Sequence, residues 1–251
     1  MIFSTMKKIY VYLLFAYCVS AKGRMRLFCL LIFGGGLPTT YSFSQDYSDA
    51  GSWNTLNIDK SINKHFTALF TEECRFRENF SRLNLFYTNL GIEYAAAKDF
   101  KAALIYRWID KWQDNQTFSF RHRLMLDLTF KHKFGNLSVS YRNRMQVEER
   151  DIYTSANGRL PEWYSRNKFG AKYDLGGRYT PFASLELRYQ FHDPRNIESD
   201  KTWHRDRYVL GAEYKINNKN SFSAYYLIQR EYNVISPQIL YIVGLEYSIL
   251  L

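Results

Sequence analysis

Apolar and polar side chains alternate with a period of two along most of the chain after residue 65. The clearest run covers residues 118–134, where one row of alternate positions holds Phe, Leu and His, and the other holds mainly Arg, Lys, Ser, Thr and Asp. Side chains on a β-strand point alternately to its two faces, whereas a helix repeats every 3.6 residues. The run therefore predicts a strand with one apolar face and one charged face.

Eleven segments of this kind follow one another. We expect strands at 53–62, 66–77, 83–94, 100–112, 117–134, 137–150, 163–175, 179–191, 203–216, 221–232 and 239–251. The connections alternate between short ones rich in Gly, Asn and Asp, which tight hairpins require, and longer polar ones. Bacterial transmembrane barrels have short periplasmic turns and longer outer loops. The pattern predicts an all-β fold, a single antiparallel transmembrane β-barrel with a polar, Arg-rich lumen.

The number of segments raises a question of parity. Single-chain bacterial barrels have an even number of strands. The ten segments from 66–77 to 239–251 form a consistent set of strands if the chain enters and leaves the barrel on the periplasmic side. Segment 53–62 is then either a lead-in, or a further strand that needs a partner within 41–51 and gives twelve. We predict ten to twelve strands and leave this choice open.

Alternation alone does not say which row faces inward. A soluble, lipocalin-like periplasmic carrier would bury the apolar row. A barrel of ten or more strands, however, is wider than the eight-stranded one whose interior side chains just fill, and aromatic residues border both ends of the strands, as at membrane interfaces. We expect the charged row to face the lumen. The lumen-lining candidates are Arg121, Arg123, Arg142, Arg144, Arg166, Arg188, Glu148 and Glu186, and the aromatic belt facing outer-membrane lipid comprises Trp108, Trp112, Trp163 and Trp203.

The arginine rows have two explanations. A ring of Arg and Lys would attract anions or phosphorylated solutes. Alternatively, the arginines pair with interleaved acids and form a neutralised ladder that fills the barrel. We favour the second, because charges in a low-dielectric setting must be matched. If the barrel conducts, the six arginine candidates are the residues expected to set its selectivity.

The first 45 residues differ from the rest of the chain. They contain five Lys and Arg, no acid, and two short apolar runs with basic flanks, which is the form of a secretory signal. We predict that residues 1–45 are a signal region cleaved near Ser44–Gln45, with Met25 as a possible true start, and that residues 46–251 form the barrel. Removing five basic residues lowers the net charge from +10 to +5, so a nucleic-acid partner is not expected. The expected location is the bacterial outer membrane.

An enzyme needs a nucleophile and a base in reach of each other. His122 and His132 lie on the apolar row, and neither has a serine two residues away. The pairs His192–Asp193 and His204–Asp206 have no metal-site spacing. We therefore predict no catalytic residue, metal or cofactor, and favour a non-enzymatic pore, plugged barrel or surface-binding scaffold. An outer-membrane lipid-modifying enzyme, with His122 as the residue to test, stays an alternative.

Several short motifs point to a family. They are Trp53, Arg75-Phe76-Arg77, Ser81-Arg82-Leu83, Gly91-Ile92-Glu93-Tyr94, Tyr106-Arg107, Tyr141-Arg142-Asn143-Arg144, Pro181-Phe182-Ala183 with Glu186, and Gly244-Leu245-Glu246-Tyr247. Over residues 50–251 the chain resembles the Bacteroidota barrel proteins grouped as domain of unknown function 2490. The resemblance implies a secreted outer-membrane barrel and supplies no activity. Barrels commonly end in an aromatic residue that the barrel-assembly machinery recognises, whereas this sequence ends in Leu251.

Overall fold

The computed structural model describes residues 14–19, 25–30, 47–113, 116–150, 161–193, 200–234 and 236–251, which fall into two units. The first unit holds an antiparallel hairpin of β1 (Leu14–Val19) and β2 (Met25–Leu30). The rest of the predicted signal region, its cleavage point near Ser44–Gln45, and the loop residues 151–160 and 194–199 lie outside the described residues. Within the described part of the chain, no helix is long and apolar enough to cross a membrane.

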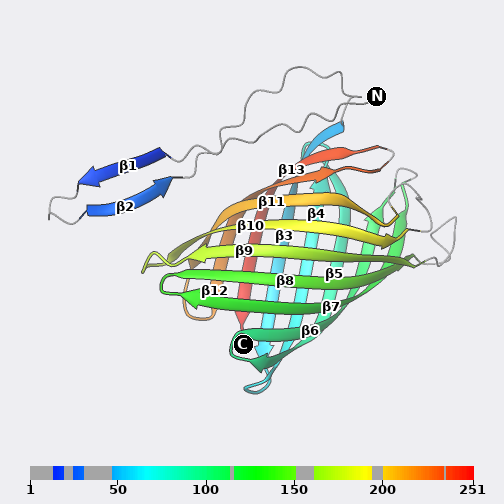
Figure 1. Ribbon diagram of the computed structural model, residues 1–251. Helices are drawn as coiled ribbons and strands as arrows, with labels where there is room; N and C mark the ends of the chain where they lie inside the picture. Colours follow the sequence, from blue (N-terminus) through cyan, green and yellow to red (C-terminus); the bar gives the residue numbers. More distant parts are fainter. Residues whose placement is uncertain are drawn as a thin grey trace, which may run out of the picture. The chain divides into compact units, whose positions relative to one another are not determined.

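The second unit is a closed β-barrel, which confirms the predicted all-β fold (Figure 1). Its strands are β3 (Tyr47–Ser61), β4 (Phe66–Arg77), β5 (Arg82–Ala97), β6 (Phe100–Trp112), β7 (Phe118–Phe134), β8 (Leu137–Arg150), β9 (Glu162–Tyr173), β10 (Tyr179–His192), β11 (Thr202–Lys215), β12 (Asn220–Glu231) and β13 (Gln238–Leu250). The bounds predicted for β4, β6 and β8 are confirmed to the residue.

The barrel closes with an odd number of strands. Neighbours from β3 to β13 pair in antiparallel fashion, and β13 then pairs with β3 in parallel, from Gln238 opposite Tyr47 to Leu250 opposite Asp59. Eleven lies within the predicted range, but the expectation of an even number is wrong. The predicted segment 53–62 belongs to a full barrel strand that begins at Tyr47 and takes β13 as its partner.

Parallel closure also sets the direction of the two seam strands. Both β3 and β13 start at the end of the barrel where the long connections gather, and both finish at the end with the tight turns. The prediction that the chain both enters and leaves the barrel on the short-turn side is therefore wrong, because the first strand starts on the other side. We call the opening of the barrel beside the long connections the loop end, and the opening beside the tight turns the turn end.

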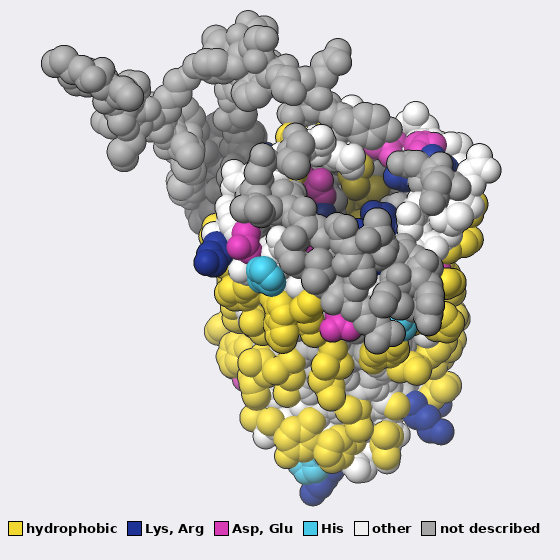
Figure 2. Space-filling view, turned by 90° about the vertical axis from the view of Figure 1, so that its right-hand side faces the viewer, with side chains coloured by type: hydrophobic (Ala, Val, Ile, Leu, Met, Phe, Trp, Pro, Cys, Tyr) yellow, Lys and Arg dark blue, Asp and Glu magenta, His cyan; other side chains and the backbone are white. Residues whose placement is uncertain are grey.

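The apolar row faces outward and the polar row faces the interior, as predicted. On β7, Leu124, Leu126 and Leu128 are 48%, 44% and 38% exposed, whereas Met125 and Asp127 between them are 0% and 6% exposed. Figure 2 shows hydrophobic side chains covering the wall of the barrel on the face in view. A lipocalin-like carrier would require the opposite orientation.

Two glycines make room for an aromatic ring on the inner wall. Tyr225 on β12 lies opposite Gly211 on β11 and Gly244 on β13. A Cβ atom at position 244 would come within 2.0 Å of the Tyr225 ring, so only glycine allows the ring to lie across this strand. Beside it, Trp53, Leu227 and Ile242 form a small buried cluster that joins β3, β12 and β13.

Candidate functional site: the barrel interior

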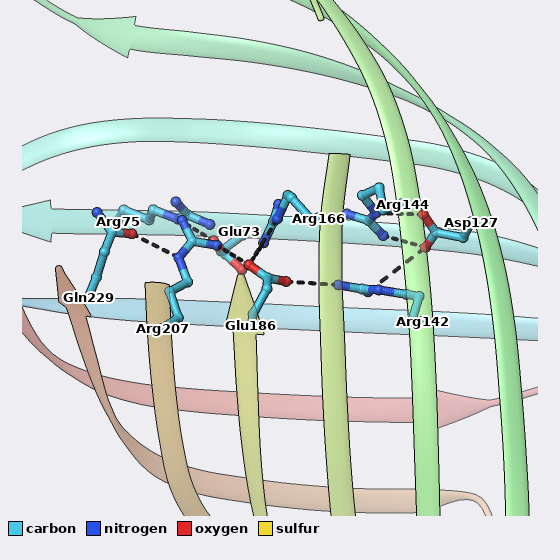
Figure 3. Close-up of polar contacts among 9 residues, drawn as sticks. All are labelled: Glu73, Arg75, Asp127, Arg142, Arg144, Arg166, Glu186, Arg207 and Gln229. Carbon is cyan, nitrogen blue, oxygen red and sulfur yellow. Dashed lines mark hydrogen bonds and ion pairs between the residues drawn. The ribbon is translucent and has the colours of Figure 1, made fainter. Parts of the chain in front are cut away.

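A layer of long side chains crosses the middle of the lumen, and we call it the central belt. Its members, in chain order from β3 to β13, are Trp53, Glu73, Arg75, Tyr87, Arg107, Asp127, Arg142, Arg144, Arg166, Glu186, Arg207, Gln229 and Ile242. Every strand of the barrel contributes at least one side chain to it. Nine of these thirteen come from β4 and from β7 to β12, and their polar contacts are drawn in Figure 3.

Glu186 on β10 is the carboxylate on which three arginines converge. It accepts hydrogen bonds from Arg166 Nε at 2.9 Å and Nη2 at 2.5 Å, from Arg142 Nη2 at 3.1 Å and from Arg207 Nη1 at 3.1 Å. These partners lie on β8, β9 and β11, so one residue links four strands (Figure 3). Glu186 is 6% exposed, and charge-assisted hydrogen bonds between guanidinium and carboxylate are among the strongest in proteins.

Asp127 on β7 continues the belt from Arg142. Arg144 donates to both of its oxygens, with Nε and Nη2 each 2.6 Å away, and Arg142 Nη1 lies 3.8 Å from Oδ2. Arg142 therefore stands between Asp127 and Glu186 and contacts both. On the far side of Glu186, Arg207 also donates from Nε to Gln229 Oε1 at 2.8 Å. The network runs without a break from β7 to β12.

Aromatic rings complete the circuit through the remaining strands. The Arg75 guanidinium lies 3.7 Å from the centroid of the Trp53 ring and forms an ion pair with Glu73. Arg107 lies 3.5 Å from the Tyr87 centroid, and Arg207 lies 5.0 Å from Trp53 on the other side of the seam. Guanidinium groups at these distances from an aromatic face are attracted by its quadrupole. Ion pairs thus dominate the belt from β7 to β12, whereas on β3 to β6 cation–π contacts accompany the ion pair between Glu73 and Arg75.

The belt divides the interior into two cavities. Eight strands give an interior that side chains just fill, so a barrel of eleven needs long side chains to close its middle. A loop-side cavity of about 630 Å³ and a turn-side cavity of about 580 Å³ lie on either side of the belt and share Trp53, Arg75, Arg107, Arg166, Glu186 and Arg207 as walls. Four of these six residues are less than 9% exposed, namely Trp53, Arg107, Glu186 and Arg207. The mid-section therefore leaves little room for solvent.

All eight lumen-lining candidates border these cavities. Arg121, Arg123, Glu148 and Arg188 line the loop-side cavity, Arg142 and Arg144 the turn-side cavity, and Arg166 and Glu186 both. The candidates omitted Glu73, Asp127 and Arg207, although the alternation puts all three on the polar row. They also omitted Trp53 and Tyr87, whose strands alternate less regularly.

The predicted aromatic belt lies on the wall near the loop end. Trp108, Trp163 and Trp203 point outward and are 50%, 49% and 43% exposed. Trp112 is half-buried and packs edge-on against Phe118, with ring centroids 4.9 Å apart. The outward position of large indole rings near strand ends is the arrangement that bilayer interfaces select.

The wall histidines do not assemble a hydrolytic site with the described residues. His122 lies on the outer face, with Nδ1 2.6 Å from Tyr106 Oη, and His132 Nδ1 lies 2.7 Å from Asp99 Oδ2 at the turn end. A Tyr–His pair lacks the nucleophile and the orienting acid of a triad. Across the described ranges, no group of three or more His, Cys, Asp or Glu is placed to hold a metal ion.

Comparison with known proteins gives one match. A family model described as "Protein of unknown function (DUF2490)" matches residues 50–238, from the beginning of β3 to the beginning of β13. No curated protein and no solved structure matches the chain. The matched stretch covers well over half of the 251 residues and carries the central belt from Trp53 to Gln229. The chain therefore belongs to the DUF2490 family of proteins of unknown function.

Proposed function

We propose that this chain is a bacterial outer-membrane β-barrel whose lumen is plugged by its own side chains, and that it serves as a non-enzymatic binding scaffold rather than an open pore. In this proposal the N-terminal region is a cleaved export signal, the barrel-assembly machinery inserts the mature chain, and the loop end faces the outside. The single observation that carries it is the central belt.

The exposed apolar wall supports membrane insertion. Soluble monomers rarely expose continuous apolar patches larger than a few hundred Å². Here rows of exposed Leu, Phe, Tyr and Trp follow strand after strand, with Leu90 56%, Leu104 51% and Leu210 68% exposed. Hydrocarbon is the environment in which such a wall is stable, and the outward tryptophans near the loop end fit its interface.

The central belt supports a sealed lumen. An ion passing along the axis would have to separate Glu186 from its arginines, and those charges are held by four hydrogen bonds in a buried setting. Buried charges that lose a partner are costly, so the network resists opening. The acids interleaved with the arginines also favour the neutralised ladder over an anion-conducting ring.

Cell fractionation tests the location. The mature protein should appear in the outer-membrane fraction, require detergent for extraction, and migrate faster before boiling than after boiling on a denaturing gel. A protein that purifies without detergent from the soluble periplasmic fraction would rule out membrane insertion and favour the lipocalin-like periplasmic carrier instead.

Planar-bilayer recording tests the plug. The wild-type barrel should be silent, whereas Arg142→Ala combined with Arg207→Ala should open a path beside Glu186 and give stepwise currents. The matched control removes two arginines outside the lumen, Arg178→Ala with Arg230→Ala, and should stay silent. Stable open channels in the wild type would refute the plug and favour the pore version.

A further inference from the structure

We infer that the loop-side cavity is a binding site for a small solute that carries several oxyanion groups, either phosphates or carboxylates. The inference deepens the proposed function, because it names the class of ligand that the scaffold would bind. Four observations carry it: an excess of positive charge, cations that make no ion pair with a described acid, buried nitrogens without a hydrogen-bond partner among the described residues, and a cavity of suitable size.

The first observation is the charge of the lining. The described residues around the loop-side cavity include eleven Lys and Arg against six Asp and Glu. The turn-side cavity has eight Lys and Arg against five Asp and Glu, and without the residues that the two cavities share the counts are seven against five on the loop side and four against four on the turn side. A concave, low-dielectric surface with one dominant sign of charge concentrates ions of the opposite sign. The loop-side cavity therefore has the larger excess of positive charge and attracts anions more strongly than the turn-side cavity.

The second observation concerns two cations that make no ion pair with a described acid. Arg188 donates to the neutral Gln190 Oε1 at 3.0 Å, and its guanidinium lies 3.5 Å from the centroid of the Tyr164 ring. Lys111, across the cavity on β6, makes no ion pair with a described residue. The nearby carboxylate of Glu148 is already shared by Arg121, Arg123 and the hydroxyl of Tyr164. A bound anion would supply the charge that these cations lack.

The third observation is a set of buried nitrogens. Nε of Arg121, Arg188 and Arg205 and Nδ1 of His204 have no hydrogen-bond partner among the described residues. Native proteins satisfy nearly all buried polar atoms, so a group of unsatisfied nitrogens facing one cavity is available to bind a ligand. His204 is 5% exposed and lies within electrostatic range of Arg188 and Arg205. These nitrogens come from β7, β10 and β11 and surround the same space.

The fourth observation is size. Small-molecule sites usually measure about 300–1,000 Å³, and this cavity of about 630 Å³ falls within that range. The belt forms its floor, and in Figure 2 Lys and Arg side chains are visible inside the opening at the loop end. Each guanidinium fork can bind two oxygens of one phosphate or carboxylate, and several arginines line the cavity, so it suits a ligand with two or more such groups.

Calorimetric titration of the purified barrel in a non-ionic detergent tests the inference, with pyrophosphate and citrate as separate probes. Each of Arg188→Gln and Lys111→Gln should weaken the preferred probe at least tenfold at constant ionic strength. Lys168→Gln, a matched lysine that lines only the turn-side cavity, should bind like the wild type. The probe that binds more tightly identifies the solute as phosphorylated or as a polycarboxylate.

Three results would overturn the inference: no saturable binding of either probe, wild-type affinity in both Arg188→Gln and Lys111→Gln, or equal weakening by Lys168→Gln. Heat-modifiable migration checks that each variant is folded, and if Arg188→Gln fails to fold, Lys111→Gln decides alone. A silent barrel that binds neither probe defeats this inference and leaves the plug intact. Open channels in a wild-type barrel that binds a probe would refute the plug and leave this inference standing.

Discussion

Replacing Glu186 with glutamine removes the carboxylate that Arg142, Arg166 and Arg207 share. The substitution keeps the volume of the side chain but leaves three buried cations without their common counter-ion. Glu186 makes four hydrogen bonds with these arginines, and the side chains of all four residues are at most 25% exposed. Breaking a buried ion pair by removing one partner costs about 3–5 kcal/mol. Because the contacts form one network, we expect a single loss of this size rather than the sum of four bonds.

Urea unfolding of the barrel in liposomes measures this loss as a shift of the midpoint at an unchanged slope. Glu213→Gln is the matched control, because Glu213 pairs with the half-exposed Lys172 at 2.7 Å and an exposed pair contributes about 0–1 kcal/mol. The double variant Glu186→Gln with Arg207→Gln should lose less free energy of unfolding than its two single variants together. The second substitution removes one of the cations that the first leaves without a counter-ion. A cost for Glu186→Gln no larger than that for Glu213→Gln would show that the belt does not stabilise the barrel, and the reasoning would fail.

Three further predictions follow from the wall, the seam and a turn. Leu126→Arg replaces an outward residue that is 44% exposed, and it should destabilise an inserted barrel by about 2–4 kcal/mol. Leu137→Arg, near the turn end, should destabilise it by only about 0–1 kcal/mol. Equal, small effects of the two substitutions would speak against a lipid-facing wall. Gly244→Ala places a Cβ 2.0 Å from the Tyr225 ring, so it should cost about 1–3 kcal/mol of unfolding free energy in urea, and Tyr225→Ala should relieve most of that cost. In the exposed turn after β9, Gly176 N donates to Asp174 Oδ1 at 2.9 Å, and this bond holds the pKa of Asp174 below its ordinary value. Asp174→Asn should therefore lower the urea midpoint at neutral pH, and the difference should vanish as the pH falls through the depressed pKa; a difference that persists in acid would contradict this origin.

The sequence pattern predicted the strands and their faces because both depend on local alternation. On β7 and β8 every second residue is polar apart from Met125, over fourteen positions or more, and one register alone puts this row inside. Segments 53–62 and 83–94 were less regular, and there the predicted bounds differ most from β3 and β5. On β3 the inward row mixes Trp53 with Gly51, Thr55 and Asn57, so it does not contrast clearly with the outward row.

The closure and the belt could not be read from local patterns, because both depend on partners far apart in the chain. β13 pairs with β3 across nearly the whole length of the barrel sequence. Arg142 and Glu186 are 44 residues apart, and Trp53 meets Arg207 from the opposite side of the seam. The alternation placed the arginines inside but did not say which acid each would contact. Glu73 and Asp127 were therefore not singled out, although both are buried at the centre of the network.

The odd strand number and the filled lumen support each other physically. Parallel pairing is slightly less stable per residue than antiparallel pairing, so the seam between β3 and β13 gains less from each of its residue pairs than the other ladders do. Side chains of the belt cross this seam: Trp53 on β3 packs with Leu227 on β12 and Ile242 on β13, and the Arg207 guanidinium of β11 lies 5.0 Å from its ring. An open pore would have to give up these contacts, and with them part of the free energy that keeps the seam closed. Contacts of the central belt thus support the eleven-stranded closure, and this is a physical reason to expect the sealed barrel with a binding cavity that we propose.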